Sequence, residues 1–264
     1  MLEHRQADAA GLGASPALLE VSDLVKNYQN LCAVDHLSFS LVGGQIVGLL
    51  GPNGAGKTTA MRCIAGILRP TSGTIRINGF DLLTQQAQAK AGLAFVPELP
   101  SLYELLTVDE HLRFVAMCYG TLDVYDAIGD ELLERYALLP KKDELVATLS
   151  KGMRQKLAIA CALVHRANVM LFDEPLIGID PAGVHEVKQE ILRAKEHGCA
   201  ILISTHLLDT AEKLCDRVLI VSKGRKIAEG TLAQLREASN LEGADLEEVF
   251  LKLTATPEPN DETQ

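Results

Sequence analysis

Residues 46–59 read Ile-Val-Gly-Leu-Leu-Gly-Pro-Asn-Gly-Ala-Gly-Lys-Thr-Thr, and this stretch decides the fold. An apolar run at 46–50 stands directly before the pattern Gly-x-x-x-x-Gly-Lys-Thr, and a helical pattern follows from Thr58 to Ile67. A strand before this pattern and a helix after it are the context in which it forms a phosphate-binding P-loop. The sequence therefore predicts a binding site for a nucleoside triphosphate.

The residue types of this loop suit an anion site. Glycines let the backbone curl so that several N–H groups point at one phosphate, and the N-terminal end of the following helix adds positive potential. Lys57 can reach the outer phosphates, and the hydroxyl of Thr58 can bind Mg²⁺. The predicted nucleotide-binding residues of the loop are Gly51, Pro52, Asn53, Gly54, Ala55, Gly56, Lys57, Thr58 and Thr59.

The composition of the 264-residue chain is that of an ordinary folded protein, with 47% hydrophobic and 23% charged residues. Its formal net charge of -10 lacks the basic excess of a nucleic-acid binder, so we expect no nucleic-acid partner. Six cysteines without a Cys-x-x-Cys pair favour free, reduced thiols over disulfides or a metal site. No stretch approaches the roughly 20 apolar residues that span a bilayer, so any spanning helices would belong to another chain.

Short apolar runs with β-branched residues predict strands, and apolar residues at helical spacing predict helices. In the second half of the chain the two patterns alternate, which argues for a parallel sheet with crossover helices. Strands are predicted at 18–25, 33–41, 73–77, 93–96, 169–172, 200–204 and 218–221, and helices at 184–196, 207–214 and 245–253.

Between about residues 105 and 167, three helical patterns follow one another without an intervening strand. This order predicts a helical subdomain, at about 101–166, inserted into an α/β domain of residues 18–238. Residues 1–17 lack the apolar core of a signal peptide, and their Ala- and Gly-rich sequence predicts a flexible tail. Residues 239–264 are expected to form a short helix followed by a Pro-rich, acidic and disordered end.

A second motif completes the predicted nucleotide site. Residues 169–174 read Val-Met-Leu-Phe-Asp-Glu, an apolar strand that ends in two acids. Asp173 at the end of such a strand can hold Mg²⁺ through water, and Glu174 can act as the general base for an attacking water. A solvated acidic turn would be the default interpretation of this segment alone, and the P-loop makes it the minority one.

Further motifs follow one another in the order and spacing of a known family. They are Lys26-Asn27-Tyr28, Leu149-Ser150-Lys151-Gly152-Met153, Ile179-Asp180-Pro181, and His206 after the strand at 200–204. With the P-loop and the acidic strand, they resemble the ATP-binding-cassette (ABC) ATPases over about residues 19–253. The resemblance implies an α/β P-loop fold with a parallel core sheet, an N-terminal antiparallel β subdomain and an inserted α-helical subdomain.

The resemblance also implies roles for these residues. Tyr28 would stack on adenine, His206 would contact the γ-phosphate, and Asp180 would belong to the loop that follows the acidic strand, called the D-loop. Ser150 and Gly152 would act on the ATP of the opposite subunit, so that two cassettes close head-to-tail around two ATP molecules. Each residue taken alone has a structural alternative: Tyr28 a strand aromatic, Ser150 a helix N-cap, and His206 a surface or capping histidine.

Three departures from the family pattern stand out, and those at Glu98, Lys151 and Met153 bear on coupling more than on binding. Lys151 and Met153 replace a glycine and the terminal glutamine of the usual Leu-Ser-Gly-Gly-Gln signature. Glu98 stands where the family usually has a glutamine, and a carboxylate can still bind Mg²⁺ or water but cannot donate an amide hydrogen bond. Leu176 and Ile177 replace a small polar pair before the D-loop glycine.

Phosphoryl transfer to water asks a protein chiefly for positioning and electrostatic stabilisation. The resemblance implies that this protein is an ATPase that uses ATP and Mg²⁺. The implied catalytic residues are Lys57, Glu174 and His206, and the implied metal ligands are Thr58, Glu98 and Asp173.

Three segments point to a membrane transporter. Residues 98–110 resemble the region that receives the coupling helix of a membrane subunit, and residues 150–157 and 245–253 look most like ABC-2-type export systems. We therefore expect an ATPase subunit that lies on the cytoplasmic face of the cell membrane. Its expected partners are an integral membrane permease and a second ATPase subunit, identical or not. The alternative is a soluble ABC ATPase that acts in complex assembly or on a non-membrane partner.

Overall fold

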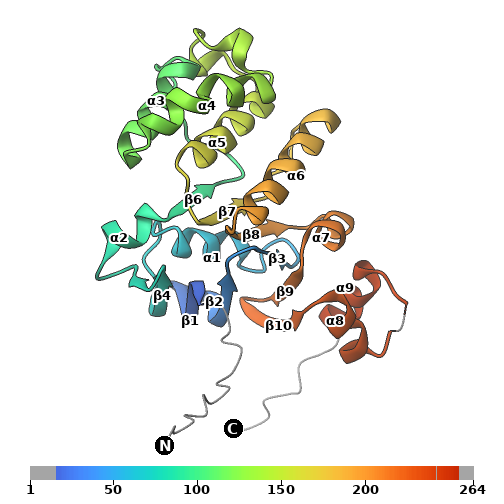
Figure 1. Ribbon diagram of the computed structural model, residues 1–264. Coiled ribbons are helices and arrows are strands. Elements are labelled where there is room, and N and C mark those ends of the chain that lie inside the picture. The colour runs from blue at the N-terminus through green and yellow to red at the C-terminus, as the bar shows by residue number, and fades with distance from the viewer. Residues whose placement is uncertain (1–15, 242, 256–264) are drawn as a thin grey trace, which may run out of the picture.

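Two sheets and a group of helices make up the computed structural model, which describes residues 16–241 and 243–255 (Figure 1). Apart from residues 16 and 17, the tail predicted at 1–17 lies outside the described residues, and so does the predicted acidic end at 256–264. Strand β1 begins at Ala17, one residue after the start of the described chain.

A six-stranded sheet forms the centre of the molecule, in the order β10-β9-β3-β8-β7-β6. Strands β6, β7, β8, β3 and β9 pair with one another in parallel, which confirms the alternation seen in the sequence. Strand β10 was not predicted, and it joins β9 as an antiparallel hairpin. The bounds are β3 (Gln45–Leu50), β6 (Leu93–Val96), β7 (Val169–Asp173), β8 (Ala200–Thr205), β9 (Arg217–Ser222) and β10 (Arg225–Gly230).

An antiparallel sheet of the N-terminal segments, in the order β2-β1-β4-β5, packs beside helix α1. Its strands are β1 (Ala17–Tyr28), β2 (Leu31–Val42), β4 (Ser72–Ile77) and β5 (Phe80–Asp81). Helix α1 (Lys57–Ile64) ends three residues before the predicted Ile67. The reason is Gly66, whose φ of 64° gives the left-handed conformation that terminates helices.

The predicted helical subdomain is present and occupies one end of the molecule (Figure 1). Its α3 begins with a capping box of Thr107 and Glu110 and ends at the left-handed Gly120. Its helices are α3 (Val108–Tyr119), α4 (Leu122–Arg135) and α5 (Lys151–Val164), with 3₁₀ turns at Leu139–Lys141 and Val146–Thr148.

The remaining helices are short or cross between strands. Helices α6, α7 and the C-terminal α9 were predicted from the sequence, whereas α2 and α8 were not. Among the described residues, no helix is both long enough and apolar enough to cross a membrane. The bounds are α2 (Gln86–Ala91), α6 (Pro181–Glu196), α7 (Leu208–Leu214), α8 (Leu232–Ser239) and α9 (Leu246–Ala255).

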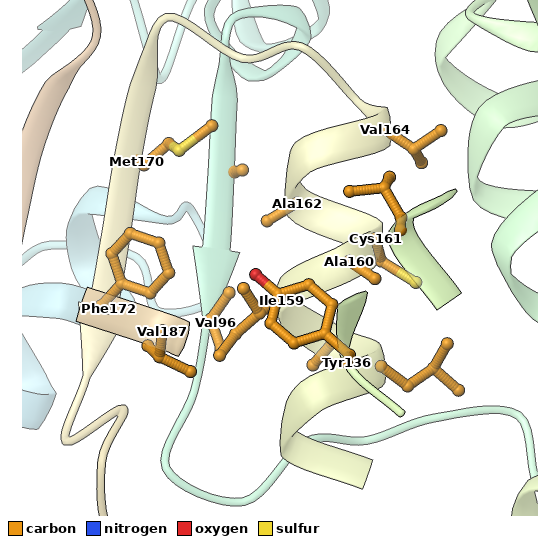
Figure 2. Packing of buried hydrophobic residues seen from close by; sticks show 14 of the residues in the cluster. Val96, Tyr136, Ile159, Ala160, Cys161, Ala162, Val164, Met170, Phe172 and Val187 are labelled. Atoms are coloured by element: carbon orange, nitrogen blue, oxygen red, sulfur yellow. The ribbon is translucent and has the colours of Figure 1, made fainter. Parts of the chain in front are cut away.

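Alternate residues of the parallel strands face two different cores. In β7, Met170 and Phe172 pack with the helices, as Figure 2 shows around Val187, whereas Val169 and Leu171 pack with the N-terminal sheet and α1. Side chains alternate along a strand, so a strand covered on both faces must be apolar at every position. Because both faces of β7 are buried, the strand is held in place, and its carboxyl end is where side chains can meet a ligand.

Candidate functional site

Three neighbouring strands bring the predicted motifs to one edge of the central sheet. The P-loop follows β3, the acidic pair lies at the end of β7, and His206 follows β8, which lies between the other two. The parallel register sets Asp173 opposite Ser204 and Leu50 opposite Thr205. The carboxyl ends of parallel strands form the usual place for ligands in open α/β sheets.

A cavity of about 510 Å³ opens at this edge. It is lined by residues that lie far apart in the sequence and come from β1, β2, the P-loop, the loop after β6, the end of β7 and the turn between β9 and β10. The predicted site residues on its walls are Tyr28, Asn53, Gly54, Ala55, Gly56, Lys57, Thr58, Thr59, Glu98 and Glu174.

The P-loop takes a path that only glycine allows. Gly54 and Gly56 have φ angles of 81° and 99°, in the left-handed region. A Cβ atom on Gly56 would lie 2.2 Å from the carbonyl oxygen of Ala33, so a side chain there would also displace β2. Both glycines therefore fix the shape of the loop by their conformation, and Gly56 also does so by close packing.

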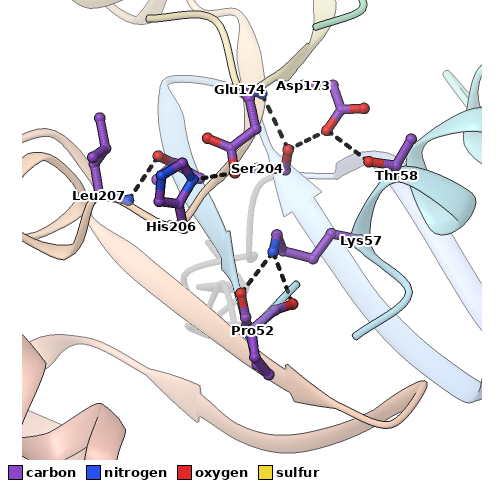
Figure 3. Close-up of polar contacts among 10 residues, drawn as sticks. Pro52, Lys57, Thr58, Asp173, Glu174, Ser204, His206 and Leu207 are labelled. Carbon is purple, nitrogen blue, oxygen red and sulfur yellow. Dashed lines mark hydrogen bonds and ion pairs between the residues drawn. The ribbon is translucent and has the colours of Figure 1, made fainter. Parts of the chain in front are cut away.

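Lys57 lies inside the loop, and only 8% of it is exposed. Its Nζ atom donates hydrogen bonds to the carbonyl oxygens of Gly51, at 2.6 Å, and Pro52, at 3.2 Å (Figure 3). Burial lowers the pKa of Lys57, and the nearby carboxylates of Asp173 and Glu174 act in the opposite direction. The loop thus holds a partly desolvated cation beside the cavity.

Oxygen atoms suited to Mg²⁺ gather beside the loop. The Thr58 hydroxyl donates to Asp173 Oδ1 at 3.4 Å, and the Ser204 hydroxyl donates to the same oxygen (Figure 3). Asp173 is buried, with 2% exposed. Among the described residues, no group of three or more His, Cys, Asp or Glu side chains could hold a metal. A hydroxyl and one carboxylate fit Mg²⁺, which usually keeps several waters and takes further oxygens from phosphates.

Glu174 is held in an uncommon conformation. Its φ of 49° is left-handed, and its backbone N–H is held by Ser204, whose carbonyl oxygen accepts at 3.0 Å. Its Oε1 atom lies 2.9 Å from Nδ1 of His206 (Figure 3), while the buried Oε2 atom has no partner in the described part of the chain. Strained backbone of this kind clusters at functional sites, and the unpartnered oxygen can accept a proton from water.

Ser150, Gly152 and Asp180 do not line this cavity. Ser150 caps α5, with its Oγ atom accepting from the Met153 N–H at 3.3 Å, which confirms the predicted N-cap. Asp180 caps α6, and its carboxylate lies 3.4 Å from Lys156 Nζ. A Cβ atom on Gly152 would lie 3.0 Å from a carbonyl oxygen of the D-loop, so these two segments contact each other.

Glu98 lies exposed on the wall of the cavity, in the loop after β6. Two polar neighbours of the site, Ser204 and Lys223, were not predicted from the sequence. Ser204 could have been found by aligning the ends of the two predicted strands, because the register sets it opposite Asp173. Lys223 could have been found from the Lys-Gly turn after the strand at 218–221, although nothing local shows what that turn contacts.

Sequence comparison identifies the family. Residues 34–177, more than half of the chain, match the family model described as ABC transporter. The chain is 37% identical over 239 residues to the ABC-type transporter ATP-binding protein EcsA of Bacillus subtilis, covering 90% of this chain and 97% of that protein. It is 38% identical over 235 residues to the Nod factor export ATP-binding protein I of Paraburkholderia xenovorans, covering 89% and 77%.

Structural comparison agrees with the sequence. A solved ATP-binding subunit of an ABC transporter matches with a TM-score of 0.87 and 39% identity, covering 90% of this chain and 99% of that one. An ATP-binding cassette in its ADP conformation matches with a TM-score of 0.71 and 25% identity, covering 90% and 99%. The chain therefore belongs to the ABC transporter family and is an ATP-binding, ATP-hydrolysing cassette subunit.

Proposed function

We propose that this chain works as one half of an ATPase dimer that powers export through a separate membrane permease. The observation that carries the proposal is the position of Ser150 and Gly152, which lie outside the cavity that holds the P-loop. A γ-phosphate beside Lys57 would need these groups from a second subunit. Two chains arranged head-to-tail would then complete two sites.

In this proposal the cavity binds ATP along its length. Tyr28, with 42% exposed, stacks on adenine, and Lys26 Nζ already lies 5.0 Å from the centre of its ring. The backbone N–H groups of the P-loop hold the phosphates. Lys57 exchanges its two carbonyl partners for phosphate oxygens, which gives its desolvated charge a stronger, anionic partner.

Hydrolysis follows from the acids and the histidine at the end of the sheet. Glu174 orients the attacking water and accepts its proton. His206 contacts both Glu174 and the γ-phosphate and so fixes their relative positions. Thr58, Asp173 and Glu98 would hold Mg²⁺. When bound, this ion would neutralise charge that develops on the phosphates. Ser204 keeps the Asp173 carboxylate in place through its hydrogen bond.

A permease partner is supported by the loop that joins the sheet to the helical subdomain. Leu99, Tyr103 and Leu105 are 65%, 60% and 87% exposed, and exposed apolar side chains that gather in one segment favour an interaction site. Export is supported by the similarity to the Nod factor export ATP-binding protein I. The subunit would therefore lie on the cytoplasmic face of the membrane, bound to its permease.

The experiment that tests this proposal is purification of a tagged copy from detergent-solubilised membranes. An integral membrane protein that copurifies with the full-length chain, and that stimulates its ATPase activity in vesicles, supports the transporter. Copurification with a soluble assembly, together with no ATPase stimulation by membrane proteins, would favour the alternative of a soluble ABC ATPase.

A further inference from the structure

The turn between β9 and β10 consists of Lys223 and Gly224, with φ angles of 48° and 84°. Two-residue hairpin turns of this kind need positive φ at both positions, and they favour Asn, Asp and Gly. A lysine in the left-handed region is uncommon and costs conformational energy. The turn therefore keeps a residue that local backbone preference does not favour.

Contacts on both sides fix this turn against the nucleotide cavity. The Gly224 N–H donates to the carbonyl oxygen of Ala55 in the P-loop at 3.0 Å, and the Asp35 N–H donates to the Gly224 carbonyl oxygen at 2.9 Å. A Cβ atom on Gly224 would lie 3.1 Å from the Ala33 carbonyl oxygen. Lys223 thus projects from a rigid support beside the P-loop.

Lys223 differs from the neighbouring cations of the hairpin in its ion pairing. Arg225 pairs with Asp35 at 2.6 Å, and Lys226 pairs with Glu229 at 2.8 Å. Lys223 lines the cavity, is exposed, and forms no hydrogen bond or ion pair with any residue of 16–241 or 243–255. An unpaired cation on a fixed turn at the wall of a cavity is placed to meet an anion.

We propose that Lys223 is a nucleotide-binding residue whose ammonium group contacts the polyphosphate tail. The inference rests on the proposed binding of ATP in this cavity. Lys57 acts from inside the loop, whereas Lys223 would act from the hairpin outside it. A contact made equally with ATP and ADP strengthens binding without accelerating the chemical step, so it should change affinity and leave kcat unchanged.

The test uses variants that separate the effect of the Lys223 charge from the effect of its left-handed backbone conformation. Lys223→Asn removes the charge while keeping a residue that tolerates the left-handed conformation, and Lys223→Arg keeps the charge. Lys213→Gln, on the exposed face of α7 and away from the cavity, removes one positive charge elsewhere. Calorimetric titration of the full chain gives the Kd for ATP and ADP at low and moderate salt, and steady-state assays give kcat at saturating ATP.

We expect Lys223→Asn to weaken binding of both nucleotides about fivefold, as one exposed ion pair allows. The difference should shrink at higher salt, while Lys223→Arg and Lys213→Gln bind as the parent does. Equal weakening in the Asn and Arg variants would overturn the inference. So would parent-like affinity in Lys223→Asn. If Lys223→Asn binds as the parent does but Lys57→Ala abolishes binding, nucleotide binding in the cavity stands and the inference about Lys223 alone fails. If nucleotide binding survives both Lys223→Asn and Lys57→Ala, the proposed nucleotide site is contradicted as well.

Discussion

Nδ1 of His206 lies 2.9 Å from Oε1 of Glu174, which joins the residues that follow the ends of β7 and β8. An ionised carboxylate only accepts hydrogen bonds, so the proton of this contact belongs to Nδ1. The contact therefore orients both side chains at once. It links the proposed general base to the proposed γ-phosphate contact.

Substitution of Glu174 by Gln should separate binding from hydrolysis. The amide oxygen of Gln can still accept from His206, so the geometry and the affinity for ATP should remain. Loss of the proton acceptor should lower kcat by at least about 100-fold, the usual contribution of general base catalysis. Phosphate release and ATP titration measure the two effects, and near-normal turnover would rule out the assignment.

Substitution of Ser204 by Ala should weaken the proposed metal site. The change removes the hydroxyl that donates to Asp173, a carboxylate with 2% of its surface exposed. Loss of an oriented outer partner typically lowers metal affinity by about tenfold or more. The Mg²⁺ concentration for half-maximal ATPase activity should rise accordingly, while ATP binding without metal stays unchanged. An unaltered Mg²⁺ dependence would contradict this role for Ser204.

Thiol labelling should locate the nucleotide. Cys32 and Cys118 are exposed, and Cys32 lines the nucleotide cavity. Burial raises the pKa of the Cys161 and Cys215 thiols to about 12, so these should stay unreactive. Mass spectrometry after brief labelling should find both exposed thiols modified. Saturating ATP should slow labelling of Cys32 and leave Cys118 as the internal control, whereas equal rates with and without ATP would place the nucleotide elsewhere.

Acid should lower the stability of the folded chain through His165, the residue that follows α5. Burial lowers the pKa of His165, whose Nε2 atom lies 2.9 Å from the Ala91 carbonyl oxygen. Between that lowered pKa and the ordinary value of 6.5, the unfolded chain binds more protons than the folded one. The free energy of unfolding should therefore fall as the pH drops below about 6.5.

Urea unfolding at pH 7.5 and pH 5.5 measures this effect. His165→Gln keeps a donor for the carbonyl and should make the pH dependence shallower. The exposed His185, changed to Gln, serves as the matched control and should leave the dependence as it is. A steeper or unchanged dependence in His165→Gln would show that another group is responsible.

Local patterns predicted much of the fold and most of the cavity wall. The P-loop and the strand before Asp173 are continuous motifs, so their chemistry can be recognised without any long-range contact. The segments β5 and α2 are too short to show a periodic pattern. The position of Lys223 depends on the hydrogen bond between Gly224 and Ala55, two residues far apart in the sequence, and no local signal reports such a contact.

The proposed function depends most on an ATP site that is split between two chains, and mixing two inactive variants tests this split directly. Lys57→Ala disables the P-loop. Ser150→Asp keeps a residue that caps α5 but brings a carboxylate towards the γ-phosphate. Each variant alone should be inactive, because every site would contain one defect. In the mixed dimer one site would carry both defects and the other would be intact, so ATPase activity should return on mixing. Activity that stays absent, in a mixture shown by mass to contain the mixed dimer, would contradict the split site.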